Sequence, residues 1–312
     1  MKLVFCGTPE FAVPTLRAVL DAGHEVALVL TQPDRPAGRK LEVHASAVKQ
    51  FAIARGLAVA QPEKIKANVE LRATLEAIQP DAIIVVAYGR IIPQWMLDLP
   101  RFGNINVHGS LLPKYRGAAP IQWAIANGER ETGITTMRLD AGLDTGDILL
   151  ERAVPIAPDA TSPDLYPILA DVGAELLLET LRGLEAGTLK PRVQDHAHAT
   201  LAPILTREDG RLDLDRTAAQ TYDRWRGFTP WPGCHAEFRG KRFLLHRLRA
   251  VEIDLPEPID PGVLFMHEDR LILGAAQNTA LWLEEVQLEG KAKLNGAAFW
   301  RDFQVKQGER VE

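Results

Sequence analysis

The sequence predicts an α/β protein in which a Rossmann-like doubly wound sheet is followed by a smaller, OB-like β-barrel domain. The first 187 residues alternate short apolar runs with amphipathic helical stretches, which is typical of a sheet covered by helices on both faces. After residue 205 the apolar runs become compact and closely spaced, which is typical of a small barrel. The 312 residues are 46% hydrophobic and 25% charged, which is enough apolar material for more than one core.

Short apolar runs bounded by turn residues predict the strands of the first domain. The run between Asp81 and Gly89 is the clearest, because an unbroken apolar run is typical of a parallel strand buried on both faces. The other strands are expected at residues 3–6, 26–30, 105–108 and 134–139. Apolar residues at helical spacing predict helices at residues 13–20, 45–55 and 119–126, and a longer one that begins near Thr161 or Ser162 and ends at Gly187.

The pattern changes between residues 188 and 205, a stretch that contains prolines and lacks strong periodicity. We therefore expect a first domain at residues 1–187, a linker at residues 188–205 and a second domain at residues 206–312. The second domain should begin with a helix near residues 217–226. Its barrel strands are expected at residues 234–238, 243–248, 262–265, 271–273 and 280–286.

Composition and charge disfavour several classes of protein. The longest stretch without a charged residue, Leu271–Leu283, has 13 residues, whereas a membrane helix needs about 20 apolar residues. Cys6 and Cys234 lie far apart, which disfavours a disulfide framework and favours a reducing cytoplasm. The net charge of −5 is not that of a protein that binds nucleic acid over its whole surface. No heptad pattern demands assembly, so we expect a monomer.

Common nucleotide-binding and catalytic motifs do not occur. The turn at Gly7 has one glycine where a dinucleotide-binding fold carries G-x-G-x-x-G, so a nicotinamide dehydrogenase is disfavoured. There is no Walker A loop and no G-x-S-x-G motif, and the chain contains only three serines: Ser46, Ser110 and Ser162. His196 and His198 are spaced like half of a metal site, but they lack a third ligand at suitable spacing. We interpret them as solvated and expect no metal.

Three polar residues form the strongest candidate site. Asn106 and His108 are two apart in a predicted strand, so their side chains point to the same face, and Gly109 ends the strand after them. Asp144 lies in a glycine-rich turn after the next strand, and that turn can bring its carboxylate to the same crevice. An amide, an imidazole and a carboxylate without a nucleophile suggest direct attack of a bound amine on a carbonyl. The alternative is a strand-end histidine and an aspartate that only forms a turn.

The motifs around these residues resemble those of a known family. The segment Asn106–Pro113 and the turn Leu143–Gly146 are similar to the signature of the folate-dependent formyltransferases. Within that superfamily the chain resembles the methionyl-tRNA formyltransferase family over roughly residues 2–300. Further matching segments lie at residues 5–9, 31–39, 86–89 and 230–233.

The resemblance implies an enzyme that transfers the formyl group of 10-formyltetrahydrofolate, its co-substrate, to the α-amino group of methionyl initiator tRNA, giving formylmethionyl-tRNA for translation initiation. It implies no permanently bound cofactor. By the same resemblance, Asn106 and His108 stabilise the oxyanion, and Asp144 handles the proton or positions His108 or a water. The residues that match the family's folate-binding segment are Ser110, Leu111, Leu112 and Pro113.

The resemblance also implies segments that bind tRNA, and in these segments the sequence departs from the family's usual pattern. The resemblance implies that the basic loop after Asp34 approaches the acceptor stem through Arg35, Arg39 and Lys40, but this loop is shorter than is usual. Five basic residues and no acidic one lie between residues 239 and 249, and we expect Lys241 and Arg242 among them to contact tRNA. The alternative for this cluster is a solvated hairpin face.

Two other functions fit parts of the sequence. A formyltransferase that acts on an amino sugar-nucleotide would carry equally good folate motifs, but residues 31–39 and the turn at Asp144 point away from it. A non-catalytic tRNA-binding protein on the same scaffold would not need an amide and an imidazole aimed at one carbonyl. We therefore expect catalysis of formyl transfer to methionyl-tRNA.

Overall fold

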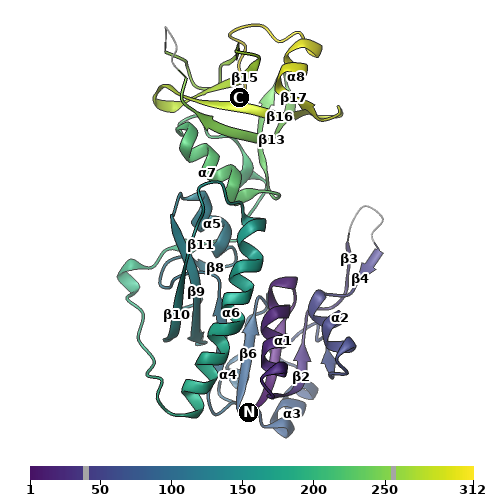
Figure 1. Ribbon diagram of the computed structural model, residues 1–312. Coiled ribbons are helices and arrows are strands. Elements are labelled where there is room, and N and C mark those ends of the chain that lie inside the picture. The colour runs from purple at the N-terminus through teal and green to yellow at the C-terminus, as the bar shows by residue number, and fades with distance from the viewer. Residues whose placement is uncertain (38–41, 254–257) are drawn as a thin grey trace. The chain divides into compact units, whose positions relative to one another are not determined.

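The structure is a computed structural model that describes residues 1–37, 42–253 and 258–312 (Figure 1). It divides into two compact units, which are described separately. The first contains residues 1–120, 131–155 and 165–203, and the second contains residues 121–130, 156–164 and 204–312. Two short stretches of the predicted first domain, residues 121–130 and 156–164, therefore belong to the second unit. The domain limits at residues 187 and 205 stay a prediction.

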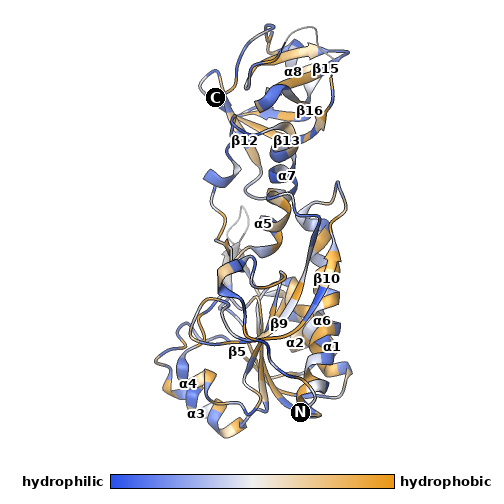
Figure 2. Ribbon diagram, turned by 90° about the vertical axis from the view of Figure 1, so that its left-hand side faces the viewer, coloured by the Kyte–Doolittle hydropathy of each residue, from blue (hydrophilic) through white to orange (hydrophobic). Residues whose placement is uncertain are grey.

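A seven-stranded mixed sheet forms the centre of the first unit. Its strand order is β10-β9-β7-β6-β1-β2-β5, in which the strands from β7 to β5 are parallel, β9 is antiparallel to β7, and β10 is antiparallel to β9. Every residue of β6 is buried, as its unbroken apolar run predicts, and Figure 2 shows hydrophobic residues along the strands of this sheet. The strands are β1 (Lys2–Gly7), β2 (Glu25–Leu30), β5 (Val59–Ala60), β6 (Ala82–Val86), β7 (Asn104–His108), β9 (Glu131–Arg138) and β10 (Ile148–Pro155).

Helices pack against both faces of this sheet. Leu75 of α3 and Met96 of α4 belong to the apolar cluster on one face. Gly173 of α6 approaches Val107 and Ile134, which point to the other face, so the doubly wound prediction is confirmed. The helices are α1 (Val13–Asp21), α2 (Ala47–Ala54), α3 (Val69–Ile78), α4 (Gln94–Leu97) and α6 (Ser162–Glu185).

Local sequence explains where several of these helices begin. Pro14 lies in the first turn of α1, where a missing N–H costs nothing. The side chains of Ser46 and Asn68 cap α2 and α3 by accepting backbone N–H groups. At the start of α6, Asp164 Oδ2 accepts hydrogen bonds from the Thr161 N–H (2.9 Å) and hydroxyl (2.6 Å), so the predicted start of this helix is correct.

Short strand pairs and 3₁₀ turns connect the main elements. The pair β8–β11 is parallel and joins the stretch after β7 to a segment within the predicted linker. This part of the predicted linker is therefore hydrogen-bonded to the first unit. The remaining short elements are β3 (Arg35–Ala37), β4 (Glu42–His44), β8 (Arg116–Gly117), β11 (Leu201–Ala202), η1 (Glu10–Ala12), η2 (His196–His198), η3 (Glu208–Gly210) and η4 (Ala276–Asn278).

The second unit is built on an antiparallel sheet with the order β12-β13-β16-β15-β14, and β17 also pairs with β16. Residues 309–312 hydrogen-bond to both edge strands: Glu237 N–H of β12 donates to Glu312 O (2.7 Å), and Leu264 N–H of β14 donates to Glu309 O (2.7 Å). These contacts close the sheet in the manner of a barrel. Its elements are most of α5 (Pro120–Ala126), α7 (Ala218–Phe228), β12 (Cys234–Phe238), β13 (Lys241–Val251), β14 (Leu264–His267), β15 (Arg270–Ala275), β16 (Thr279–Leu288), β17 (Leu294–Asn295) and α8 (Gly296–Asp302).

The predicted fold class is thus confirmed as a mixed α/β sheet followed by an antiparallel β domain. Helices α3, α4 and α8 are additional to the predicted elements. Among the residues that the structure describes, no helix combines the length and the apolar character that a membrane crossing requires.

Aromatic rings form the centre of the core of the second unit. Phe299 of α8 is fully buried, and its ring centroid lies 4.8 Å from that of Phe243 and 5.7 Å from that of Phe238. Phe299 is therefore the fully buried aromatic side chain through which this helix packs on the sheet, with Trp300 and Phe303 also packed against the core.

Truncation of Phe299 should destabilise the protein strongly. We expect Phe299→Ala to lower the free energy of unfolding by about 3–5 kcal/mol, because it removes a buried ring and leaves a cavity. The control Ile204→Ala, at a side chain of the same unit that is 74% exposed, should change it by less than about 0.5 kcal/mol. Urea unfolding followed by tryptophan fluorescence measures both. Equal small losses would contradict the placement of Phe299 in the core.

Candidate active site

Asn106 and His108 lie on one face of β7, as the strand pattern predicts. β7 is hydrogen-bonded to β6 along one edge and to β9 along the other, so its backbone is held from both sides. The His108 side chain is buried, with 5% of its surface exposed, and Asn106 is half-buried. The sheet therefore fixes the amide and the imidazole close together.

Asp144 lies in the turn between β9 and β10. Because β9 is antiparallel to β7, this turn begins beside Asn104 at the amino end of β7, and not beside His108. The Asp140 carboxylate folds the turn by accepting a hydrogen bond from Thr145 Oγ1 (2.7 Å). Asp144 then returns to the face of β7 that carries His108. Its carboxylate lies 3.7 Å from His108 Nδ1, but the rule for parallel strands does not explain how Asp144 reaches this position.

The Asp144 carboxylate brings the three predicted residues together. Its Oδ2 accepts a hydrogen bond from the Gly117 N–H (2.8 Å) and lies 3.7 Å from His108 Nδ1. Its Oδ1 accepts a long hydrogen bond from Asn106 Nδ2 (3.5 Å). Asp144 has a φ of +52°, which lies in the left-handed region that aspartate adopts more readily than most residues with a side chain.

The hydrogen bonds of His108 distinguish its two ring nitrogens. Nε2 lies 2.9 Å from the backbone oxygen of Tyr115, and a carbonyl oxygen can only accept, so Nε2 carries a proton. Nδ1 is then the nitrogen that faces Asp144. An amide that donates, an imidazole and a carboxylate are suited to stabilise a developing oxyanion and to move a proton.

The predicted folate-binding segment forms a tight turn after β7. Ser110 is fully buried, and its hydroxyl donates to a backbone carbonyl within the turn (2.7 Å). Leu112 is also buried, in a small apolar cluster with residues of β9 and β10. Leu111 and Pro113 remain partly exposed. The side chains of Ser110 and Leu112 therefore shape the turn, and those of Leu111 and Pro113 are the ones open to a ligand.

Two residues of the predicted linker reach the same site. Gln194 is buried and donates to the backbone oxygen of Asp144 (2.9 Å). Thr200 Oγ1 accepts a hydrogen bond from the Tyr115 N–H (2.9 Å). Sequence reasoning missed both, because a glutamine and a threonine in an aperiodic stretch carry no local signal.

The two histidines of the linker face the surface. His196 Nδ1 lies 3.0 Å from Arg116 Nη2, and His198 Nδ1 lies 2.8 Å from Asp195 Oδ2. Over the described ranges, no group of three His, Cys, Asp or Glu side chains is arranged to hold a metal ion.

Three loops meet at the carboxyl ends of β1, β2 and β6. The Gln32 side chain, after β2, donates to the backbone oxygens of Tyr88 (3.1 Å) and Gly89 (2.9 Å), which follow β6. Thr8 Oγ1, after β1, also donates to Tyr88 O (3.2 Å). Ile91, beyond the same turn, is 91% exposed. The hydrogen bonds hold these loops at the edge where open α/β sheets bind ligands.

Asp34 is tied into these loops by two partners. Its carboxylate forms an ion pair with Lys49 of α2 and accepts a hydrogen bond from Gln61 Nε2 (2.7 Å). Two hydrogen bonds lower the pKa of Asp34 below its ordinary value, and the one from Lys49 has a larger effect than the one from Gln61. The basic loop predicted to bind tRNA therefore begins after a residue whose side chain is held by Lys49 and Gln61.

The residues predicted to contact tRNA differ in how far they are exposed and in how much of them the structure describes. Arg39 and Lys40 lie outside the described residues, and only the backbone of Arg35 is described. Lys241 is exposed at the start of β13. Arg242, next to it, is half-buried, with Nη2 3.2 Å from His235 Nδ1.

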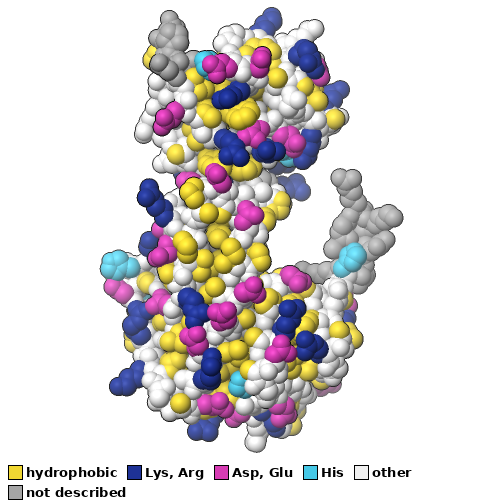
Figure 3. All heavy atoms as spheres, in the orientation of Figure 1, with side chains coloured by type: hydrophobic (Ala, Val, Ile, Leu, Met, Phe, Trp, Pro, Cys, Tyr) yellow, Lys and Arg dark blue, Asp and Glu magenta, His cyan; other side chains and the backbone are white. Residues whose placement is uncertain are grey.

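Much of the basic cluster at residues 239–249 is paired with acidic residues from elsewhere in the chain. Arg247 and Arg249 both pair with Glu284 of β16 (2.7 Å each), and Arg239 pairs with Glu309 (2.7 Å). On the face drawn in Figure 3, basic and acidic side chains are interspersed. The cluster therefore adds less positive surface than its local sequence suggests.

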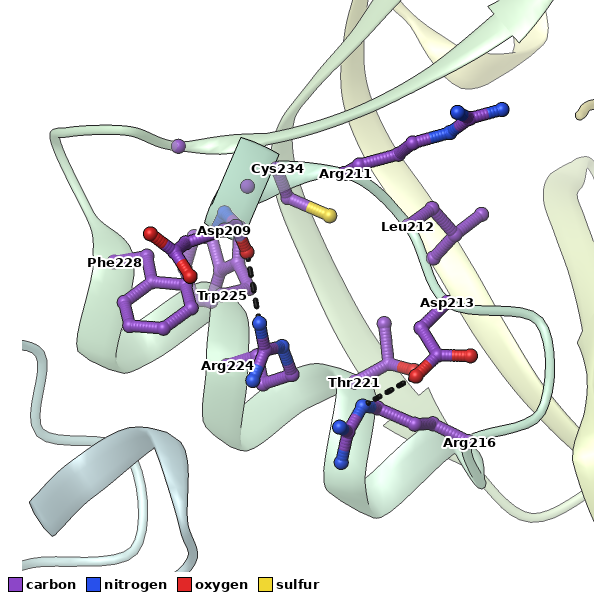
Figure 4. Close-up of a pocket in the computed structure, with 12 residues that line it drawn as sticks. Asp209, Arg211, Leu212, Asp213, Arg216, Thr221, Arg224, Trp225, Phe228 and Cys234 are labelled. Carbon is purple, nitrogen blue, oxygen red and sulfur yellow. Dashed lines mark hydrogen bonds and ion pairs between the residues drawn. The ribbon is translucent and has the colours of Figure 1, made fainter. Parts of the chain in front are cut away.

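A small pocket lies in the second unit, between α7 and the stretch of residues 209–216 (Figure 4). Arg224 Nη2 donates to Asp209 O (2.9 Å) at its wall, and Arg216 pairs with Asp213 (2.9 Å). Its cavity volume of about 10 Å³ gives room for about one water molecule. The pocket contains none of the predicted site residues and is too small for a folate.

Two protein-family models match the chain in succession. The model described as formyl transferase matches residues 1–181, and the model of the formyl transferase C-terminal domain matches residues 204–304. The methionyl-tRNA formyltransferase of Acidobacterium capsulatum is 61% identical over 96% of each chain. That of Koribacter versatilis is 58% identical over 100% of this chain and 98% of its own. The chain therefore belongs to the methionyl-tRNA formyltransferase family.

Solved structures share the fold at lower identity. The sugar 3N-formyl transferase WlaRD, crystallised in the presence of dTDP and 5-N-formyl-THF, has a TM-score of 0.66 at 18% identity and covers 94% of this chain and 99% of its own. HypX from Aquifex aeolicus, in complex with tetrahydrofolic acid, has a TM-score of 0.59 at 22% identity and covers 100% of this chain and 50% of its own. These similarities establish the fold alone.

Removal of the Lys49 ammonium group should raise the pKa of Asp34. A lowered carboxyl pKa means that the stabilisation from this contact is present above the unfolded pKa and is lost as the pH falls through the folded one. In Lys49→Met we expect the Asp34 pKa to move up toward its ordinary value. Lys64 is an exposed lysine, so in the control Lys64→Met we expect the Asp34 pKa to stay unchanged. Carboxyl ¹³C NMR titration measures the shift, and identical Asp34 titrations in Lys49→Met and wild type would refute this cause.

Proposed function

We propose that the protein transfers the formyl group of 10-formyltetrahydrofolate to the α-amino group of methionyl initiator tRNA. The observation that carries this proposal is the meeting of Asn106, His108 and Asp144 on one face of β7. The names of its relatives support methionyl-tRNA as the acceptor. None of these three residues is a serine, a cysteine or a lysine, so in the proposed reaction the amine itself attacks.

The proposed reaction exchanges one carbon–nitrogen bond for another. The amino nitrogen bonds to the formyl carbon, negative charge collects on the formyl oxygen, and the bond from that carbon to the folate N10 then breaks. The amine loses one proton and the departing folate nitrogen gains one. Asn106 Nδ2 and the protonated His108 ring donate hydrogen bonds to the oxygen while it is negative.

His108 and Asp144 divide the proton handling between them. Because His108 Nε2–H donates to Tyr115 O, Nδ1–H is the group that donates to the oxyanion and then passes its proton to the departing folate N10. The Asp144 carboxylate, 3.7 Å from Nδ1, stabilises the charged ring and accepts the proton of the amine, directly or through a water. The Gly117 N–H holds the carboxylate in place for this role.

The remaining predicted contacts complete the proposal. Folate lies against the turn of Ser110, Leu111, Leu112 and Pro113, mainly on the two partly exposed side chains. The tRNA contacts the basic loop of the first domain and the second domain, through Arg35, Arg39, Lys40, Lys241 and Arg242. The protein acts as a cytoplasmic monomer without a permanently bound cofactor, with domains at residues 1–187 and 206–312 joined at 188–205.

A formylation assay separates this proposal from its rivals. The purified protein and 10-formyltetrahydrofolate would be mixed with charged initiator methionyl-tRNA, charged elongator methionyl-tRNA or an amino sugar-nucleotide. We expect product on the initiator tRNA alone. Product on the sugar would favour a sugar formyltransferase, and folate or tRNA binding without any product would favour a binding protein. Product on both tRNAs would keep the chemistry but refute discrimination between them.

Asp144→Asn should abolish most of the transfer without loss of the fold. Asparagine still offers an oxygen to the Gly117 N–H, but it carries no charge and accepts no proton, so we expect kcat to fall by about 10²-fold or more. Folate affinity should be retained. The matched control Asp147→Asn, in the same turn, should keep its activity. Unchanged turnover in Asp144→Asn, measured by the same assay, would rule out the assigned role.

A further inference from the structure

Gln194 is connected to both sides of the candidate site. Only 3% of its surface is exposed. Its Nε2 donates to the backbone oxygens of Asp144 (2.9 Å) and Gly146 (2.7 Å), and its Oε1 accepts from Arg116 Nε (3.1 Å) and Nη2 (2.6 Å). Both N–H groups of the amide are therefore used, and its oxygen accepts twice. One buried side chain thus ties the Asp144 turn to the stretch that contains Arg116.

Thr200 makes a second connection from the same segment. Its Oγ1 accepts the Tyr115 N–H (2.9 Å), and its backbone oxygen accepts the Arg116 N–H (2.8 Å). Tyr115 is the residue whose carbonyl receives the Nε2–H of His108. Gln194 and Thr200 therefore hold the two residues that lie on either side of the His108 ring.

Both of these residues have a backbone conformation that most side chains disfavour. Asp144 has a φ of +52° and Tyr115 a φ of +62°, and neither is a glycine. A side chain disfavours this left-handed region, more strongly at the bulky Tyr115 than at an aspartate, so neighbouring groups that fix these two backbones favour the observed conformation. The hydrogen bonds of Gln194 and Thr200 act on the backbones of these same residues.

The segment that carries Gln194 and Thr200 is itself anchored at both ends. Arg192 exchanges two backbone hydrogen bonds with Ile148 of β10 (2.8 Å each). Leu201 and Ala202 form β11 and pair with β8. Between these anchors the segment has little freedom to move, so it can serve as a rigid support.

We propose that Gln194 and Thr200 are positioning residues for the proposed formyl transfer, which hold Asp144 and Tyr115 so that the carboxylate and the imidazole meet at the correct distance. This inference rests on the proposed function. Neither side chain touches the reacting atoms. Their loss should therefore slow the chemical step and leave folate binding unchanged.

Isosteric and conservative variants test this role. Gln194→Leu keeps the shape and removes all four hydrogen bonds, and Thr200→Val keeps the shape and removes the hydroxyl. We expect kcat to fall about tenfold or more in each, with the KM for folate within about twofold of wild type. Thr200→Ser, which keeps the hydroxyl, should restore kcat. Val193→Ala, at an adjacent side chain that is 71% exposed, should act as wild type.

A second measurement does not depend on activity. The amide proton of Gly117 donates to Asp144 Oδ2, so its NMR chemical shift reports the position of the carboxylate. We expect Gln194→Leu to move this resonance toward the position of a free amide, while Val193→Ala leaves it in place. Circular dichroism at the assay temperature gives the folded fraction of each variant.

The outcomes separate the two proposals. If wild type forms no formylmethionyl-tRNA, the proposed function fails, while the Gly117 resonance still tests whether Gln194 positions Asp144. If wild type is active and Gln194→Leu keeps both its kcat and the Gly117 resonance, the positioning role is wrong. A loss of activity that only follows the folded fraction would also overturn it, because Gln194 would then serve stability alone. A lower kcat per folded molecule, with the KM for folate retained and the Gly117 resonance shifted, supports it.

Discussion

The contact between the Asp144 carboxylate and the Gly117 N–H is the interaction on which the site depends. This hydrogen bond of 2.8 Å joins the turn after β9 to the stretch after β7. It places one carboxylate oxygen next to His108 and leaves the other within reach of Asn106. Without it, the turn at Asp144 would have no direct bond from its carboxylate to the backbone of that stretch. The register of β7 against β9 decides where the Asp144 turn begins, and Gln194 holds the backbone of Asp144. Both therefore help to place the carboxylate at this contact.

The mixed sheet explains why such a contact is needed. Parallel strands bring the ends of their loops to one edge, and the loops after β1, β2 and β6 meet there. β9 runs the other way, so its following turn starts at the far end of β7 and must cross back to reach His108. A turn that crosses a sheet face has few strand hydrogen bonds of its own. Side chains from distant parts of the sequence, such as Gln194, supply the missing ones.

The sequence predicted those parts of the structure that local patterns specify. Periodicity and turn residues predicted β6 and α6. The two-residue period of a strand predicted that Asn106 and His108 point to the same face. Contacts between distant residues left no such signal. Gln194 lies 50 residues beyond Asp144 in an aperiodic stretch. The cluster at residues 239–249 has no acid in its own sequence, yet strand pairing places Glu284 beside Arg247 and Arg249. The closing contacts of Glu312 with β12 are equally non-local.

The most direct test is a crystal structure of the protein with bound 5-formyltetrahydrofolate, a stable isomer of the proposed co-substrate that carries its formyl group on N5 instead of N10. The account predicts that the folate lies against Leu111 and Pro113, with N10 on the side of Asn106 and His108 and the Asp144 carboxylate still bonded to the Gly117 N–H. A folate bound away from β7, with Asn106 and His108 contacting no part of it, would contradict the central claim that Asn106, His108 and Asp144 surround the N10 position from which the formyl group is transferred.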